Sequence, residues 1–165
     1  MTTTAPAASS ALAPLVDALC AQPIDTLDVA GLQAQISLVT PQVFRLQGWL
    51  TSVAGRLDEL TGGTVPTQDG RTRTVAGWLA EVQHATAGSA GSQLRTARLL
   101  QSLPLVTAAV LDGVLTPAQA AVLTRLVGTI DPAGLQESQP QLITVAAAMD
   151  PVQLGAWVAH QIATH

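Results

Sequence analysis

Apolar residues between 29 and 60 recur at alternating intervals of three and four residues. This regularity constrains the fold more than any other feature of the sequence. Ten positions follow it without a break: Val29, Leu32, Ile36, Val39, Val43, Leu46, Leu50, Val53, Leu57 and Leu60. Such spacing places all ten side chains in one stripe of an α-helix, at the a and d positions of a heptad repeat. We call this stripe the seam. It predicts one long helix, roughly 50 Å in length if it is continuous.

The ends and the middle of this helix carry their own signals. Thr26 is the expected N-cap, with Asp28 in the first turn, where the helix dipole favours a carboxylate. The pair Gly62 and Gly63 is expected to end the helix. Pro41 has no amide hydrogen to donate, so it is expected to kink the helix or to divide it.

Two interpretations of the seam are open from the residues alone. The flanking e and g positions hold mostly Gln, Thr and Ala rather than paired charges, so no code for a partner helix is present. This favours burial of the seam by other helices of the same chain, with Leu46 and Val53 as core residues. In the alternative, two chains share the seam, and the β-branched residues at its first a positions would favour a two-stranded coiled coil. A short apolar helix at 10–21 is expected to pack back on the long one.

Start and stop signals divide the rest of the chain into short helices. Residues 61–70 contain three Gly and one Pro and are expected to be a linker. Beyond them, a capping residue precedes Pro at 116–117, 131–132 and 150–151, which is typical of a helix start. No segment alternates apolar and polar residues as a strand does. The expected organisation is a disordered leader (1–10), a short and a long helix (11–60), the linker (61–70) and an all-α cluster (71–165).

The composition excludes several chemistries. The chain has 165 residues, of which 48% are hydrophobic and 11% charged, with a net charge of −4. It is too apolar to be disordered and too acidic to be a general nucleic-acid coat. There is no Lys, which excludes a Schiff base and a P-loop lysine. No apolar run reaches the ~18 residues of a membrane span.

Cysteine and histidine give no sign of a metal site. The single cysteine, Cys20, excludes an intramolecular disulfide and a thiolate zinc site and fits a cytoplasmic protein. His84, His160 and His165 are isolated, at spacings that do not suit a shared metal ion. We therefore expect no metal, no cofactor and no catalytic site in these residues.

Basic residues gather in one segment of this acidic chain. Between 71 and 98 there are four Arg and one acid, a net charge of +3, whereas the rest of the chain carries −7. The segment is expected to form a helix at 73–84, a turn with Gly88, and a second helix N-capped by Ser89, which is the helix-turn-helix plan. The residues expected to contact DNA phosphates or guanine edges are Arg71, Arg73, Arg95 and Arg98.

Two stretches resemble a known family. Residues 69–80 (DGRTRTVAGWLA) and 97–123 (ARLLQSLPLVTAAVLDGVLTPAQAAVL) are similar to the domain of unknown function 222, a large actinobacterial-type family that usually precedes an HNH endonuclease domain. The resemblance extends over residues 27–163. The second stretch also resembles, less closely, the helix-turn-helix of ParB-type partition proteins. Where the family often has a His, this chain has Gln119, which we interpret as a capping residue.

The resemblance implies a module that associates with DNA or positions a nuclease on it. An HNH site needs clustered His with Asn or an equivalent to hold a divalent metal, and this chain has no Asn. The expected function is therefore a non-catalytic module, from a longer nuclease or a stand-alone copy, with DNA as its partner. The alternative is a helical self-association or protein-interaction module without a nucleic-acid role, in which the seam would form a homodimer.

Overall fold

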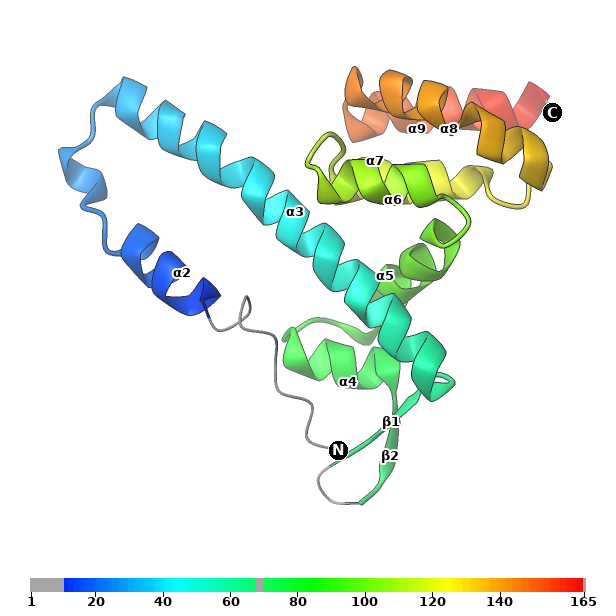
Figure 1. Cartoon of the computed structure of the whole chain (residues 1–165), viewed down its shortest axis with the longest axis horizontal. Helices are drawn as coiled ribbons and strands as arrows, with labels where there is room; N and C mark the ends of the chain where they lie inside the picture. The colour runs from blue at the N-terminus through cyan, green and yellow to red at the C-terminus, as the bar shows by residue number, and fades with distance from the viewer. Residues whose placement is uncertain (1–10, 68–69, 165) are drawn as a thin grey trace. The chain divides into compact units, whose positions relative to one another are not determined.

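The computed structural model describes residues 11–67 and 70–164, and its fold is all-α apart from one small β-hairpin (Figure 1). A long helix followed by shorter ones is the order that the sequence predicts, so the predicted fold class is confirmed. The expected leader at 1–10 lies outside the described residues. The chain divides between Val39 and Thr40 into two compact units, and the long helix α3 (Val29–Thr61) contributes to both.

The described part of the N-terminal unit forms no core of its own. It consists of α2 (Leu12–Cys20), the short 3-10 helix η1 (Ile24–Thr26) and the first part of α3. None of its described residues is buried. The apolar side chains of α2 remain exposed, as Leu15 does at 68%. The packing expected between the helix at 10–21 and the long helix therefore buries no residue within this unit.

The ends of α3 are set by local hydrogen bonds. Asp28 caps the helix, because its Oδ1 accepts the amide of Gly31 at 2.8 Å, whereas Thr26 lies in the preceding 3-10 helix. The expected N-cap was thus two residues too early. At the other end, Gly62 and Gly63 adopt positive φ angles of 61° and 87° and end the helix as predicted.

Pro41 lies inside α3 without ending it. Of the two predicted outcomes, a kink or a division, the division does not occur. A proline within a helix removes one backbone hydrogen bond and crowds the preceding turn. Residues beyond it are held by packing against α5 (Ala87–Leu100) and α6 (Pro104–Leu111), and this tertiary support outweighs the local cost.

Two short strands pair as a hairpin where the sequence predicts a linker and no strand. Strand β1 (Thr64–Pro66) pairs antiparallel with β2 (Thr72–Thr74), so that Val65 lies opposite Arg73. Val65 is 7% exposed and belongs to a small core with Val75 and Leu79. The predicted linker is thus part of the C-terminal unit. Strands of three residues are too short to show a recognisable alternation.

The C-terminal unit is a cluster of short helices around a second, larger core. Besides α5 and α6 it contains α4 (Val75–Val82), α7 (Pro117–Leu123), η2 (Thr124–Leu126), α8 (Pro132–Ala147) and α9 (Pro151–Thr164). Helices α6 and α7 lie against α8 and α9 (Figure 1). The most deeply buried leucines of this core are Leu103, Leu115, Leu123, Leu126 and Leu154.

Capping residues begin these helices largely as predicted. Thr116 and Gln119 form a reciprocal capping box at the start of α7, and Asp131 and Asp150 cap α8 and α9. The start of α5 differs, because Thr86 and not the expected Ser89 is its N-cap. The preceding helix α4 is shorter than the predicted 73–84.

Candidate functional site

The seam of α3 is exposed. Eight of its ten side chains are at least 38% exposed, among them Leu46 at 40% and Val53 at 43%, whereas Val39 and Leu57 are partly buried. The expectation that helices of the same chain bury most of the seam is therefore wrong, and Leu46 and Val53 are not core residues.

Exposed hydrophobic side chains are concentrated in the same part of the chain. Among the described residues, 19 large hydrophobic side chains are exposed, and 15 of them lie between Leu12 and Leu60. The other four are scattered over the C-terminal unit: Val82, Leu105, Val114 and Val152. Single exposed apolar residues are normal on a protein surface, but a contiguous stripe of them marks an interaction surface.

The face of α3 that packs within the chain is a different one. It is formed by Gly48, Thr51, Gly55 and Asp58, which repeat at intervals of three, four and three residues. In the heptad that defines the seam, these are b and f positions, which lie on the side of the helix opposite a and d. Ala54, at an e position, is also buried, and Leu57 of the seam packs against the same small core. The C-terminal half of α3 therefore has a small, largely polar face that packs and an apolar face that is exposed except near Leu57.

Two glycines explain why the small face packs. A Cβ added to Gly48 would overlap Cγ1 of Val110 on α6, and one added to Gly55 would lie 2.8 Å from Cβ of Ala97 on α5. Only residues without a side chain allow this close an approach between helices. Sequence reasoning missed this face, although two glycines seven residues apart in one helix are a readable signal.

An ion pair between α3 and α5 fixes the end of the small face. Arg98 donates through Nε to Oδ2 of Asp58 at 2.7 Å and through Nη2 to Oδ1 at 3.0 Å. Asp58 is 7% exposed. The hydrogen bond and the charge of Asp58 raise the pKa of Arg98 above its ordinary value, so the guanidinium stays charged. Arg98 thus holds α5 against α3, a role that differs from the expected DNA contact.

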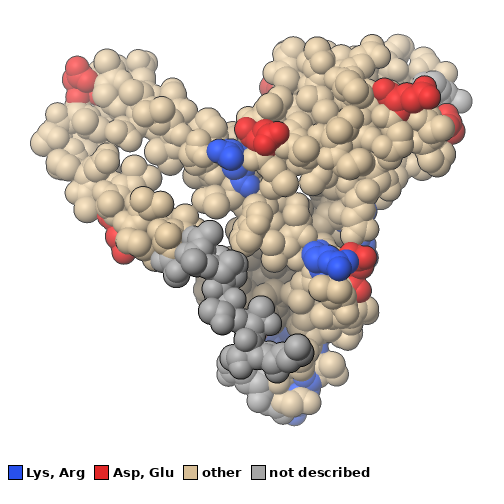
Figure 2. All heavy atoms as spheres, in the orientation of Figure 1, with Lys and Arg blue, Asp and Glu red and all other residues tan. Residues whose placement is uncertain are grey.

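The other three arginines of the predicted DNA site lie in different surroundings. Arg73 pairs with Glu81 of α4. The backbone carbonyl of Arg71 accepts hydrogen bonds from Thr67 and closes the hairpin, and its side chain is exposed. Arg95 is exposed on α5 and makes no ion pair with any described residue. The face of the molecule in Figure 2 shows no continuous basic patch.

Helices α4 and α5 pack on each other and provide the predicted two-helix unit. Its second helix is nevertheless partly engaged, because Ala97 touches α3 and the neighbouring Arg98 reaches Asp58. A recognition helix needs a face that is open to the DNA groove. The two arginines of α5 are both exposed, but Arg98 is paired with Asp58, whereas Arg95 makes no ion pair with any described residue.

Two glutamines are buried in the larger core, and each forms hydrogen bonds with backbone groups at the end of another helix. Nε2 of Gln119 donates to the carbonyls of Ala146 and Met149 at the end of α8. Oε1 of Gln139 accepts from the amide of Leu105 at the start of α6 at 2.9 Å. Gln119 is therefore a capping residue, as interpreted from the sequence.

Among residues 11–67 and 70–164, no three His, Cys, Asp or Glu side chains gather where they could hold a metal ion. His84 follows α4 with a φ of 50°, and His160 is exposed on α9, while His165 lies outside the described residues. No described helix has the length and hydropathy that a membrane span requires.

Comparison with models of protein families, with curated proteins and with solved structures gives no match for this chain. The resemblance to the domain of unknown function 222 therefore stays a prediction, and so does the weaker likeness to ParB-type proteins.

Proposed function

We propose that this chain is a helical self-association module, in which α3 pairs with α3 of a second copy through the seam. The observation that carries the proposal is the exposure of eight of the ten seam residues, together with the concentration of exposed hydrophobic side chains between Leu12 and Leu60. Apolar surface of this extent is favourable to bury, at about 25 cal/mol per Å².

A second copy is the occupant that best fits the chemistry of the seam. An unbroken three-four spacing is self-complementary, since the same helix presents the same knobs and holes. Val29, Ile36 and Val43 at a positions are typical of two-stranded pairing. The sole charged e or g residue between 29 and 61 is Arg56, which pairs with Glu59 of its own helix, so like charges do not repel across the interface.

The size of the surface is also suitable. The a, d, e and g positions of α3 amount to about 20 residues, of which Ala54 is buried within the chain, and the rest come close to the ~20–30 residues that each partner contributes to a standard interface. The N-terminal unit, in which residues 11–39 include no buried one, supplies the first part of this helix together with α2. Isolated helices as short as α2 are marginal in water, so this unit gains most from a partner.

Sedimentation velocity tests the proposal directly. We expect the parent chain to sediment as a dimer and Leu46→Asp to sediment as a monomer, because a carboxylate at a d position would be buried without a partner. The variant should keep its helical circular dichroism, since Leu46 is 40% exposed in the single chain.

The matched control is Leu105→Asp, on α6. Leu105 is the same residue type, is 47% exposed and lies outside the seam, so this variant should remain a dimer. A parent that is monomeric at tens of micromolar, or a control that dissociates as readily as Leu46→Asp, would overturn the proposal.

DNA association by the α4/α5 unit is a second candidate, and one specific observation favours it. Arg95 projects from the second helix of the unit, is exposed and makes no ion pair with any described residue. Fewer arginines are available to bind phosphates than the net charge of the segment indicates, because Arg73 and Arg98 are paired with acids. Few phosphates could be neutralised, so binding would be weak and sensitive to salt.

A mobility-shift assay at low salt tests this candidate with Arg95→Ala and the control Arg125→Ala. Arg125 is exposed on η2, outside the α4/α5 unit. Loss of Arg95 should weaken binding and flatten the slope of log K against log salt by about 0.9, while the control should leave both unchanged. Equal binding by the two variants would exclude a role for α5 in DNA contact.

A further inference from the structure

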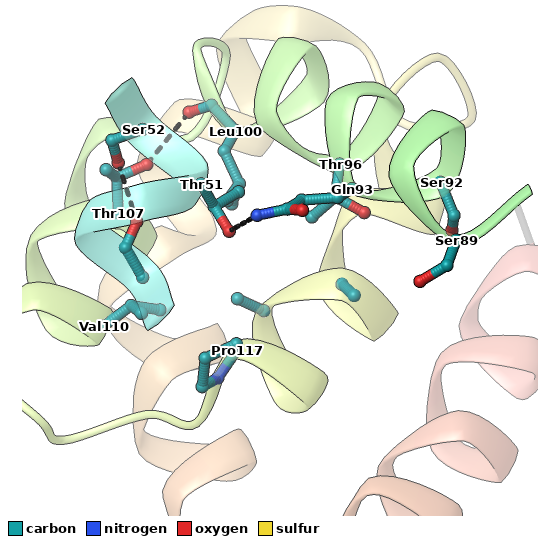
Figure 3. A pocket seen from close by; sticks show the side chains of 13 residues that line it. Thr51, Ser52, Ser89, Ser92, Gln93, Thr96, Leu100, Thr107, Val110 and Pro117 are labelled. Carbon is teal, nitrogen blue, oxygen red and sulfur yellow. Dashed lines mark hydrogen bonds between the residues drawn. The ribbon is translucent and has the colours of Figure 1, made fainter. Parts of the chain in front are cut away.

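A hollow of about 240 Å³ lies in the C-terminal unit, between the second half of α3 and helices α5, α6 and α7 (Figure 3). One wall is apolar and includes Leu100, Val110 and Pro117. The other is lined by Ser92, Gln93 and Thr96 of α5 and by hydroxyl groups of α3. The hollow is open to solvent, and it combines an apolar wall with a few polar groups, which is the usual character of a small-molecule site.

The hollow exists because small side chains face each other across it. Gly48 brings α3 into contact with α6, and the next turn carries Thr51 and Ser52 rather than larger residues. Ala120 and Ala121 line the side that α7 provides. Gln93 is the long polar side chain that reaches across the hollow, and most of the other lining residues are small, so part of the space between the helices is left open.

Hydrogen bonds differ between the two helices that supply its polar groups. Thr51 and Ser52 on α3 donate to backbone carbonyls of their own helix, at 2.9 and 3.1 Å. Gln93 donates through Nε2 to Oγ1 of Thr51 at 3.2 Å, across the hollow (Figure 3). In contrast, the hydroxyls of Ser92 and Thr96 on α5 have no hydrogen-bond partner among the described residues. No buried side-chain nitrogen or oxygen among the described residues lacks a partner, so these two hydroxyls face water and are available to a ligand group.

No ionisable side chain lines the hollow. A charged ligand would therefore lose its hydration without gaining a partner of opposite charge. We propose that this pocket binds a compact, uncharged molecule with an apolar body and one hydroxyl or carbonyl group. The apolar body lies against Leu100 and Val110, and its polar group bonds to the free hydroxyl of Thr96. The ligand is smaller than drug-sized ones, whose sites measure ~300–1,000 Å³.

Amide chemical shifts of the full-length ¹⁵N-labelled chain test the pocket, with cyclohexanol as the probe. We expect saturable shifts confined to the lining segments of α3, α5, α6 and α7. Cyclohexanecarboxylate and cyclohexylammonium have the same ring with a negative or a positive charge, and each should bind at least tenfold more weakly. The absence of saturable shifts, or equal binding of either charged probe, would overturn the proposal.

Two variants locate the binding. Ala121→Leu fills the hollow and should abolish the shifts, whereas Ala118→Leu, on the exposed side of the same helix, should bind like the parent. Thr96→Val keeps the side-chain volume and removes the hydroxyl, so affinity for cyclohexanol should fall several-fold. If Ala121→Leu disturbs the fold, the affinity of Thr96→Val for cyclohexanol is the test of the binding site. Unchanged affinity in Thr96→Val, or in a folded Ala121→Leu, would contradict the assignment.

Discussion

Residues 12–60 and residues 75–164 are both helical and both rich in Leu, Val and Ala, yet they bury these side chains very differently. In the second region, Leu103, Leu126 and Leu154 are completely buried. In the first, the buried residues of α3 are Gly48, Ala54, Gly55 and Asp58, and no large hydrophobic side chain of α2 or α3 is buried. Apolar content therefore does not decide which helices form a core.

The difference comes from which face of each helix meets a neighbour. In the C-terminal unit, helices of 7 to 16 residues turn their apolar stripes toward one another and close a common core. The second half of α3 joins that unit through its small face, because glycine permits a closer approach than a leucine stripe would. Its seam is left for another partner. A heptad pattern thus indicates that a stripe needs burial, without indicating which chain buries it.

The largest expected loss of stability comes from a substitution in the core of the second region. Leu126 is fully buried, so Leu126→Ala should lower the free energy of unfolding by ~2–5 kcal/mol through lost burial and a residual cavity. Leu50→Ala, at 48% exposure on the seam, should cost less than ~1 kcal/mol in the monomeric chain. Urea unfolding followed by circular dichroism, at concentrations where the chain is monomeric, measures both. Equal losses of unfolding free energy in the two variants would show that the two regions do not differ in how deeply they bury their leucines.

A smaller change in stability is expected from adding a methyl group to the packed face of α3, and it can be compared with the same change at an open position of α5. Gly55→Ala should destabilise the fold by roughly 1–3 kcal/mol, because the new Cβ would lie 2.8 Å from that of Ala97. The same substitution at Gly91 of α5 meets no atom within 4 Å and should stabilise the helix by up to ~1 kcal/mol. Thermal unfolding should therefore shift in opposite directions. A shift of the same sign in both variants would contradict the close approach of α3 and α5.

The smallest expected effect concerns the ion pair that joins α3 to α5. Arg98→Ala leaves the carboxylate of Asp58, which is 7% exposed, without its partner, and should cost about 1 kcal/mol. The effect is modest because the side chain of Arg98 is itself 60% exposed to water. Arg95→Ala, one turn earlier on the same helix, should leave the free energy of unfolding unchanged. Comparable losses in the two variants would mean that the pair does not support the small face.

Much of the local structure could be read from the sequence. The end of α3 at Gly62 and the starts of α7, α8 and α9 were predicted correctly, since caps and stops depend on residues within about four positions of each other. The errors at Thr26 and Ser89 are of two or three residues, because several Ser, Thr and Asp side chains near a helix start compete for the same amides.

The candidate sites were less predictable. Four arginines in one segment indicated a basic surface, but two of them are neutralised by acids, and Asp58 lies 40 positions away from Arg98. The exposed seam was identified residue by residue, while its burial within the chain was wrongly expected. The hairpin and the pocket were not anticipated at all.

By itself, the sequence determined where helices begin and end and which side chains share a stripe, because backbone hydrogen bonds and helical periodicity act over a few residues. Only the tertiary structure decided which stripe of α3 packs, which acid Arg98 meets, and that small residues on α3, α5 and α7 line a hollow. These outcomes depend on contacts such as that between Thr51 and Gln93, 42 positions apart. Several faces of one helix can satisfy the same local rules, and the face that packs is the one whose shape fits its neighbours most closely.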